Sequence, residues 1–566
     1  MKANFWSVLA IPAVALLLSG CGGLGKMVKK YKDVSYKVTP EILEAHGGKV
    51  GVKVDGTFPA KYFNKKATLT LTPVIKYEGG ETPLKPITVE GEAVKGGGKV
   101  IAVSGGSFSY VDTAMYKDAM KNCELVANVK VAIGTKSADL EVRKLAIGTI
   151  ITSTRVAKEE VPLLGGDKYE KETYFNQDAE VYFPIQQSTI MEKEKNSQSV
   201  KALREFAKKG YPTKSITITA YASPDGPIDL NDNLSKGRGD NSVKYVQGEL
   251  KKLKIPGADN SALYNVQSKG EYWDGFTKLV SASSIEDRQL IINIVNSHTD
   301  VDKREQEIKN LAVVYTKLAQ DILPKLRKSE ISVTALEPKL TDAQMDSLAI
   351  ADPDSLKPEE LLYAATLTTD LEKKKKIYES FTSLHTSDWR GPNNVAFIQL
   401  KQKNPAGAKT NLDKAKGLIA NNGTILNNEG VVATWESDFE GGKTFYQSAK
   451  DNGADVSRNM GFYYLRKGQY LSALQYMGAE CSYNVALAQL LQKNYDEAGK
   501  KLNCADQNGA THYLKAVLGA RTNNVDMVIT NLKKAVELDA SYRQEALNDL
   551  EFAKYKDSAD FKNAVQ

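Results

Sequence analysis

Apolar and polar residues alternate most clearly in the first third of the chain. Valine recurs at every second position in Val50, Val52 and Val54, and leucine alternates with threonine over residues 68–72. Period-two alternation places successive side chains on opposite faces of a half-buried strand. Turns rich in glycine, asparagine and aspartate separate these runs, which favours antiparallel pairing. We therefore predict an antiparallel β-sandwich over residues 47–162.

The pattern changes after a linker around residues 163–171. Apolar residues form short strand-like runs in 181–185 and 216–220, and between these runs they recur at the spacing of a helix. This order of strand, helix and strand predicts an α+β unit over residues 172–335. A helical stretch from 281 to 326 either extends the core of this unit or presents a surface to a partner.

Small residues recur in pairs twelve positions apart in the last third of the chain, and a bulkier residue follows the first of each pair by nine positions. The pairs are Ala396 with Ala408, Gly430 with Gly442, Gly461 with Ala473 and Ala486 with Ala498, and the bulkier residues are Pro405, Phe439, Tyr470 and Tyr495. A weaker fifth unit contains Ala516, Val525 and Val528. This is tetratricopeptide (TPR) spacing, in which small residues let two helices pack closely and a bulky residue starts the second helix.

These repeats predict an α-helical TPR solenoid over residues 358–566, preceded by a linker at 336–357 that is rich in proline and aspartate. The last residues, from 539 onward, are expected to form a helical cap. Such solenoids expose a concave face that mostly binds peptides or other domains. We therefore expect protein partners for this region.

The N-terminus carries an export pattern. Lys2 precedes an apolar run from Phe5 to Leu18 that is too short to span a bilayer. Leu18-Ser19-Gly20-Cys21 resembles the lipobox of bacterial lipoproteins, and this resemblance implies cleavage before Cys21 and acylation of that residue. An ordinary secretory signal that happens to contain a cysteine is the alternative.

With the lipobox, residues 1–20 are a signal peptide and residues 21–46 a lipidated linker. Several acyl chains anchor a protein stably, at about 0.8 kcal/mol per buried methylene. No acidic run follows Cys21 of the kind that resembles surface-export signals. We expect a lipid anchor in the outer membrane, with the protein facing the periplasm.

Charge and the remaining chemistry narrow the functional classes. The chain has 76 Lys and Arg against 69 Asp and Glu, a net charge of +7 over 566 residues, without a basic stripe interleaved with aromatic residues. Nucleic acid is not an expected partner. The four histidines are scattered and lack metal-site spacing, and no nucleophile–base or paired-carboxylate arrangement stands out. We expect no enzyme activity, no catalytic residues, no cofactor and no metal.

Three cysteines remain after Cys21. Cys481 and Cys504 lie 23 residues apart in one predicted helical hairpin, where the start of one helix and the end of the next approach each other. An exported protein meets an oxidising compartment, so a disulfide between them is possible. Cys123 has no predicted partner.

One segment carries a family motif. Asn231, Leu234, Ser235 and Arg238 follow the Asn-x-x-Leu-Ser-x-x-Arg spacing. With the strand before it, this motif resembles the peptidoglycan-binding C-terminal domain of the OmpA family. The resemblance implies binding of diaminopimelate in the peptidoglycan stem peptide, with the family's arginine taking the carboxylate and its aspartate the ammonium. Arg238 stands at the position of the arginine, and Ser223 stands where the family usually has the aspartate.

The substitution leaves the acidic half of the clamp open. Asp225, in the same turn, is the nearby acid that would replace the missing aspartate, although Asp229 and Asp232 follow. The candidate peptidoglycan-binding residues are therefore Arg238, Asp225, Ser223 and Asn231. Loss of one charge-assisted hydrogen bond would cost about 1.5–3 kcal/mol of binding. Alternatively, Arg238 pairs with a neighbouring aspartate in a fold that no longer binds the cell wall.

The order of modules resembles outer-membrane lipoproteins of the Bacteroidetes. This resemblance implies a tether that contacts peptidoglycan through the OmpA-like domain and proteins through the TPR solenoid. The alternative is an accessory subunit of an outer-membrane assembly or secretion complex, whose OmpA-like domain does not bind peptidoglycan.

Overall fold

The computed structural model describes residues 22–566, which divide into two compact units. The discontinuous unit contains the described residues up to Gly166 together with 374–566, and the central unit contains 167–373. Cys21 and the lipobox lie outside the described residues. Within 22–566, no helix is both long enough and apolar enough to cross a membrane.

The discontinuous unit begins with a short helix and two sheets. Helix α1 (Gly23–Lys29) buries Leu24 and Met27. The five-stranded sheet contains β1 (Ser35–Thr39), β2 (Leu43–His46), β3 (Lys49–Phe58), β8 (Gly106–Met115) and β12 (Thr149–Ile150). The seven-stranded sheet contains β4 (Ala67–Tyr77), β5 (Gly80–Pro83), β6 (Ile87–Gly91), β7 (Lys99–Ile101), β9 (Cys123–Ile133), β10 (Lys136–Asp139) and β11 (Arg143–Ile147). Most neighbouring strands are antiparallel, and β12 with β2 and β6 with β7 are parallel pairs.

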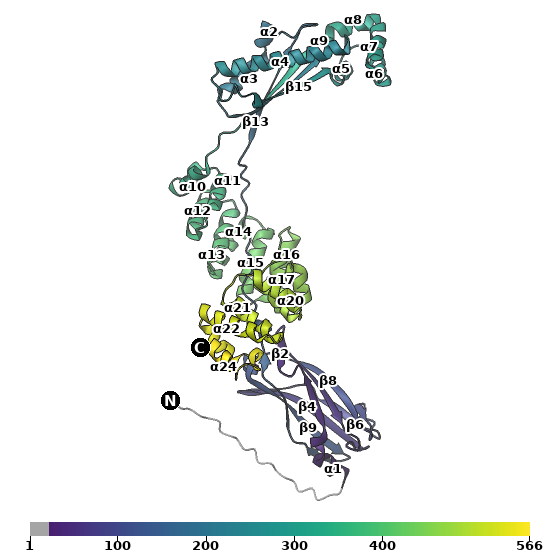
Figure 1. Ribbon diagram of the computed structural model, residues 1–566, viewed down its shortest axis with the longest axis vertical. Helices are drawn as coiled ribbons and strands as arrows, with labels where there is room; N and C mark the ends of the chain where they lie inside the picture. The colour runs from purple at the N-terminus through teal and green to yellow at the C-terminus, as the bar shows by residue number, and fades with distance from the viewer. Residues whose placement is uncertain (1–21) are drawn as a thin grey trace. The chain divides into compact units, whose positions relative to one another are not determined.

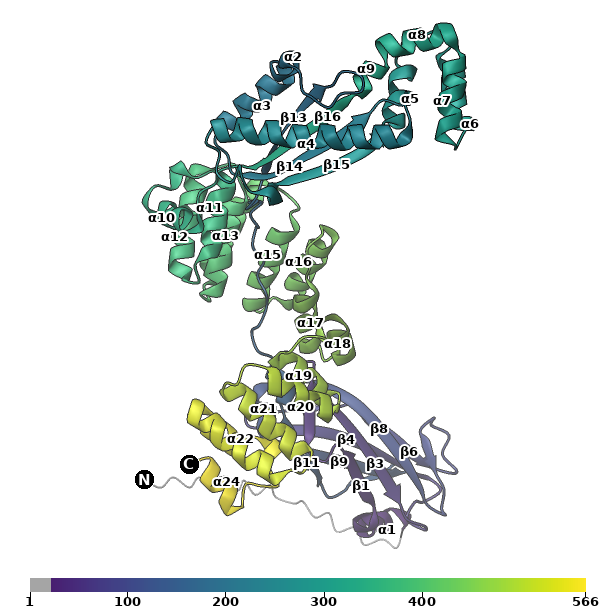
Figure 2. The same cartoon turned by 45° about the horizontal axis from the view of Figure 1, so that its top comes forward.

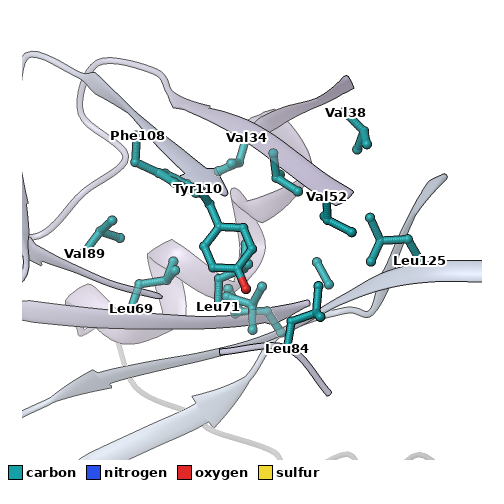
Figure 3. Packing of buried hydrophobic residues seen from close by; sticks show 14 of the residues in the cluster. Val34, Val38, Val52, Leu69, Leu71, Leu84, Val89, Phe108, Tyr110 and Leu125 are labelled. Carbon is teal, nitrogen blue, oxygen red and sulfur yellow. The ribbon is translucent and has the colours of Figure 1, made fainter. Parts of the chain in front are cut away.

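The alternating side chains of both sheets meet in one core. Figure 3 shows Phe108 and Tyr110 of β8 facing Leu69 and Leu71 of β4. Along β3, every second residue is buried, as the period-two pattern predicts. The sheets start before the predicted boundary at 47, because β1 and β2 already pair with β3.

The C-terminal part of the discontinuous unit is a run of paired helices. Each pair begins its second helix at the bulky residue that the spacing predicts. The pairs are α13 (Arg390–Lys401) with α14 (Pro405–Leu418), α15 (Gly423–Trp435) with α16 (Phe439–Asp451), α17 (Ser457–Arg466) with α18 (Tyr470–Met477), α19 (Tyr483–Leu491) with α20 (Tyr495–Cys504) and α21 (Gly509–Arg521) with α22 (Val525–Leu538). Helix α12 (Leu371–Leu384) precedes them, and α23 (Ser541–Asn548) and α24 (Ala559–Ala564) follow.

The small residues are required where the two helices of a pair cross. A Cβ at Gly430 would clash with the ring of Tyr446, and a Cβ at Gly442 would clash with Thr434. The turn between the helices holds a left-handed residue just before the capping position, as at Lys403 before Asn404. The predicted helical repeats are therefore confirmed, including the weaker fifth unit.

The sandwich packs against the last repeats within the same unit. The hydroxyl of Thr152, which follows β12, donates to Glu551 at 2.5 Å, and Arg521 of α21 forms an ion pair with the same carboxylate at 2.6 Å. His46 at the end of β2 contacts the Tyr470 hydroxyl at 2.7 Å. Sheets and helices are thus one compact body.

The central unit is an α+β unit built on a four-stranded sheet. Its strands are β13 (Tyr174–Tyr182), β16 (Lys328–Leu336), β14 (Thr213–Ala222) and β15 (Tyr264–Glu271), in that order. Only β14 and β15 are parallel. Helices α3 (Gln198–Lys208) and α4 (Ile228–Lys252) lie side by side on one face of the sheet (Figure 2).

Two helical regions complete the central unit. Between β15 and β16 lie α5 (Trp273–Ser281), α6 (Arg288–Ser297), α7 (Val301–Asn310), α8 (Ala312–Asp321) and α9 (Leu323–Leu326), which share a core of their own (Figure 1). Helices α10 (Asp342–Ala351) and α11 (Pro358–Ala364) follow β16. The predicted linker at 336–357 thus contains a helix, because Thr341 and Gln344 form a capping box that starts α10.

Candidate functional site

The predicted clamp residues lie close together in the central unit. Ser223 and Asp225 are in the turn after β14, and Asn231 and Arg238 are on α4. Ser223, Asn231 and Arg238 are all buried, with 4%, 3% and 1% of their surface exposed. The sequence therefore identified one cluster, and its hydrogen bonds decide what the cluster can bind.

The guanidinium of Arg238 is used by the main chain of its own unit. It donates to the carbonyl oxygens of Tyr221 at 2.8 Å, Gln187 at 3.1 Å and Pro184 at 3.4 Å. Within residues 22–566 its recorded hydrogen bonds all go to carbonyls and none to a carboxylate. Burial lowers the pKa of Arg238 to about 10, the nearby Arg327 guanidinium also lowers it, and Asp225 opposes them. Arg238 therefore lies inside the fold as a buried cation.

Asp225 is held by a different arginine. Its carboxylate forms an ion pair with Arg327 at 2.8 Å and accepts a hydrogen bond from the Ser223 hydroxyl at 2.6 Å. Arg327 also donates from Nε to the Ser223 oxygen at 3.0 Å. Ser223 thus bridges Asp225 and Arg327, and the carboxylate that was the candidate for the ligand's ammonium is paired with Arg327 inside the protein.

Side chains of the inserted helices lie near the same cluster. The Asn231 amide donates to Glu271 at 2.8 Å, and the Glu271 carboxyl faces Glu305 of α7. Burial raises the pKa of Glu305 to about 7, the ion pair with Lys309 at 2.9 Å opposes this, and Glu271 adds to it. The Asp225 carboxylate contributes to a raised pKa of Lys309 and of Tyr315 on α8. The insert therefore places charged side chains near the turn that would have to admit a ligand.

A second site lies in the discontinuous unit and was not predicted. Residues 155–166, which we call the strap, run as extended chain along the first helices of the repeats (Figure 2). Four buried asparagines, which we call the asparagine ladder, hold the strap: Asn394 of α13, Asn428 of α15, Asn459 of α17 and Asn484 of α19.

Each asparagine of the ladder makes two hydrogen bonds to a single strap residue. Asn428 accepts from the Leu163 N–H at 2.6 Å and donates to the Leu163 carbonyl at 2.7 Å. The same double contact joins Asn394 to Gly165 at 2.7 and 2.9 Å, Asn459 to Val161 at 2.8 and 2.9 Å, and Asn484 to Ala157 at 2.9 and 2.9 Å. A side-chain amide presents one acceptor and a donor, as a neighbouring β-strand does. The asparagine ladder therefore binds the peptide backbone of the strap and satisfies it as a sheet would.

Two charged side chains fix the strap in register. Glu160 is buried, with an ion pair to Arg466 at 2.6 Å and a hydrogen bond from the Trp435 indole at 2.7 Å. Arg155 pairs with Asp549 at 2.9 Å and lies over the ring of Tyr513 at 4.0 Å. The strap therefore lies along the first helices of the repeats with matched charges at defined places.

The sequence contained a signal for the asparagine ladder. In four repeats, an asparagine precedes the first small residue by two positions, as Asn428 precedes Gly430. Two positions along a helix turn the side chain away from the face that packs on the paired helix. Buried asparagines that recur on this second face indicate a ligand that the four repeats share. That ligand is the strap, which includes part of the segment interpreted as a linker at 163–171 together with the residues before it.

The cysteines after Cys21 do not form part of either cluster. Cys481 precedes α19, Cys504 ends α20, and the two are joined in a disulfide with their Cα atoms 5.8 Å apart. Cys123 is buried and free. In the part of the chain that the structure describes, no group of three or more His, Cys, Asp or Glu side chains is arranged to hold a metal ion.

Comparisons with known proteins give only remote likenesses. No protein-family model matches the chain, and neither does any curated protein. The chain is similar to a tetratricopeptide repeat protein from Parabacteroides merdae, at 10% identity and TM-score 0.29 over 37% of this chain and 91% of that chain. It is similar to PilF of Pseudomonas aeruginosa, at 16% identity and TM-score 0.25 over 39% and 97%. It is also similar to the APC/C hetero-tetramer Cut9-Hcn1, at 14% identity and TM-score 0.31 over 66% and 84%.

Proposed function

We propose that this chain is a non-enzymatic envelope scaffold, anchored through Cys21 to the periplasmic face of the outer membrane. In this proposal it is an accessory subunit of a protein complex, and its OmpA-like central unit is structural and does not bind peptidoglycan. The observation that carries the proposal is the state of Arg238. A guanidinium that is 1% exposed and donates to three carbonyls is not presented to the carboxylate of a stem peptide.

The acidic half of the clamp supports the same proposal. Diaminopimelate would need a free carboxylate for its ammonium, and Asp225 is already neutralised by Arg327. Separating a buried ion pair leaves two uncompensated charges, which costs about 3–5 kcal/mol. A ligand would have to supply that energy to free the Asp225 carboxylate.

The strap limits where protein partners can bind on the repeats. The amides of the asparagine ladder are already satisfied by the strap, so partners are expected on the outer helices of the repeats. Lys409 of α14 and Lys534 of α22 are at least half exposed there and are suited to lysine-specific crosslinking. Crosslinking in the native envelope, followed by mass spectrometry, should join these lysines to another protein.

Co-sedimentation with purified peptidoglycan tests the structural role of the central unit. The full chain and Arg238→Ala are compared at low salt, with Lys236→Ala on the exposed side of the same helix as the matched control. We expect none of the three in the pellet above a mock pellet. Binding by the full chain and by Lys236→Ala, lost in an Arg238→Ala protein that remains folded, would establish the wall tether instead.

The membrane anchor has a separate test. Cys21→Ala should move the protein from the membrane fraction to the soluble periplasmic fraction. Continued membrane association of this variant after a high-salt wash would contradict anchoring through lipid.

A further inference from the structure

A basic pocket lies at the start of the described chain. It has a volume of about 520 Å³ and is lined by Lys26 of α1, by Lys61, Lys65 and Lys66 of the loop between β3 and β4, and by Gly23 and Asn64. Sites for small ligands have volumes of about 300–1,000 Å³. The pocket is therefore large enough for a polar group bigger than a single ion.

The backbone holds this loop in place. The N–H of Lys61 donates to the Val103 carbonyl at 2.7 Å, and the N–H of Lys66 donates to the Asn64 side chain at 2.9 Å. The side-chain amide of Asn64 also packs on Gly23, where a Cβ would clash with it. Helix α1 and the loop therefore form one preformed wall, which keeps the four lysines together in the absence of a ligand.

The charge of the pocket is not neutralised by the protein. Residues 22–33 and 61–66 contain seven lysines and one acidic residue. Among residues 22–566, no ion pair is recorded for Lys26, Lys61, Lys65 or Lys66. Four like charges around one cavity repel one another, so the arrangement favours an anionic ligand. A lysine ammonium group binds phosphate as a point charge and does not need the bidentate geometry of an arginine.

The position of the pocket identifies the source of the phosphate. Gly23 is two residues from the predicted acylation site Cys21, so at most about 7 Å of extended chain separates that site from this wall. Acylation of Cys21 would place its acyl chains in the bilayer. Figure 1 shows α1 at the end of the sandwich that lies away from α21 and α24. The pocket would then face the lipid headgroups within about one Debye length.

We infer that this pocket binds the phosphate of an anionic lipid headgroup and so orients the sandwich on the membrane. The inference deepens the proposed membrane anchoring by adding a second, electrostatic contact. A lipid chain alone leaves a protein free to rotate about its point of attachment, whereas four lysines in a fixed wall define which end of the sandwich meets the membrane.

Vesicle co-sedimentation tests the pocket without the acyl anchor. The protein used is residues 22–566, which is all of the chain that the structure describes. The anionic vesicles are phosphatidylcholine with about 30 mol% phosphatidylglycerol, and the neutral vesicles are phosphatidylcholine alone. We expect binding only to the anionic vesicles, because each lysine near such a surface contributes about fivefold in affinity.

Variants then distinguish the pocket from general charge. The triple change Lys61→Gln, Lys65→Gln and Lys66→Gln should weaken binding by about a hundredfold. The triple change to arginine at these positions should retain it. A matched control replaces the exposed lysines Lys201, Lys214 and Lys236 of the central unit with glutamine, which gives the same net charge and should bind like the unchanged protein.

Other results would overturn the inference. Equal loss in the pocket and control variants would mean that only net charge matters, and equal binding to neutral vesicles would exclude phosphate recognition. Isothermal titration with inorganic phosphate separates the two sources of phosphate: tight binding of the free ion without vesicle binding would contradict the lipid assignment. Because residues 22–566 lack Cys21, failure of the vesicle assay is distinct from failure of the anchoring test.

Discussion

The strap gives a quantitative prediction at Asn428. This side chain is fully buried and makes both hydrogen bonds to Leu163, and its amide also donates to Asn393 at 3.0 Å. In Asn428→Ala, the Leu163 N–H loses its acceptor. The Leu163 carbonyl keeps only a longer contact of 3.4 Å from Asn393. The substitution therefore removes one complete rung of the asparagine ladder.

The magnitude follows from the two groups affected. An orphaned buried N–H costs about 1–3 kcal/mol, and the second lost hydrogen bond costs about 0.5–1.5 kcal/mol. We expect the strap to open more easily by about 2–4 kcal/mol near Leu163. In hydrogen exchange, this corresponds to opening that is roughly thirty to several hundred times more frequent.

Hydrogen exchange measured by mass spectrometry on peptides covering residues 159–166 checks the prediction. The matched control is Asn427→Ala, which is the same change at an equally buried neighbour on the same helix. Asn427 donates to the Val161 carbonyl at 3.0 Å but accepts from no strap N–H, and that carbonyl keeps its bond from Asn459. Unchanged exchange in Asn428→Ala, or the same increase in both variants, would refute the reasoning that backbone hydrogen bonds hold the strap.

Three further predictions concern stability. Arg238→Ala should lower the free energy of unfolding of the central unit by about 3 kcal/mol or more in urea titrations, because carbonyls lose a buried cationic donor, whereas Lys236→Ala on the exposed side of α4 should stay within about 0.5 kcal/mol. Since the pKa of Glu305 is raised in the folded state to about 7, the folded state binds more protons than the unfolded state between about pH 4.5 and 7. As far as Glu305 is concerned, the stability of the central unit should therefore be highest below pH 4.5 and fall by up to about 3 kcal/mol as the pH rises through 7. Glu305→Gln should flatten this part of the profile of stability against pH. An identical profile in the variant would contradict the assignment. Cys481→Ser should destabilise the oxidised protein by about 3 kcal/mol, because the disulfide closes a loop of 23 residues, and dithiothreitol should lower the midpoint of the unchanged protein but not that of the variant.

The elements that the sequence predicted are those whose signal is periodic. Alternation along β3 and the twelve-residue spacing of the repeats report local packing, in which a strand face or a helix crossing needs a particular residue size at a fixed interval. Helix starts such as Phe439 and Tyr470 follow from that spacing. The motif expectation at residues 223–238 also brought Ser223, Asp225 and Arg238 into one cluster.

The partners within the sites were not predictable in the same way. Arg327 lies 102 residues from Asp225 in the chain, and no local pattern says which of two arginines takes a given carboxylate. The strap has no hydrophobic period, because its backbone is satisfied by side chains of distant helices. Residues 163–166 of the strap fall in the predicted linker and residues 155–162 in the predicted sandwich, although Glu160 is buried among the repeats.

The geometry of the ladder has a mechanical consequence. The strap ends at Gly166, where the chain enters the central unit, so a pull on Gly166 along the axis of the strap would be borne by the asparagine ladder. The hydrogen bonds from Asn394, Asn428, Asn459 and Asn484 are made across this axis and would be loaded together in shear. A bond array loaded in this way resists force better than one that is peeled apart a pair at a time. The ladder would therefore transmit load from the central unit into the repeats and sandwich before any rung opens.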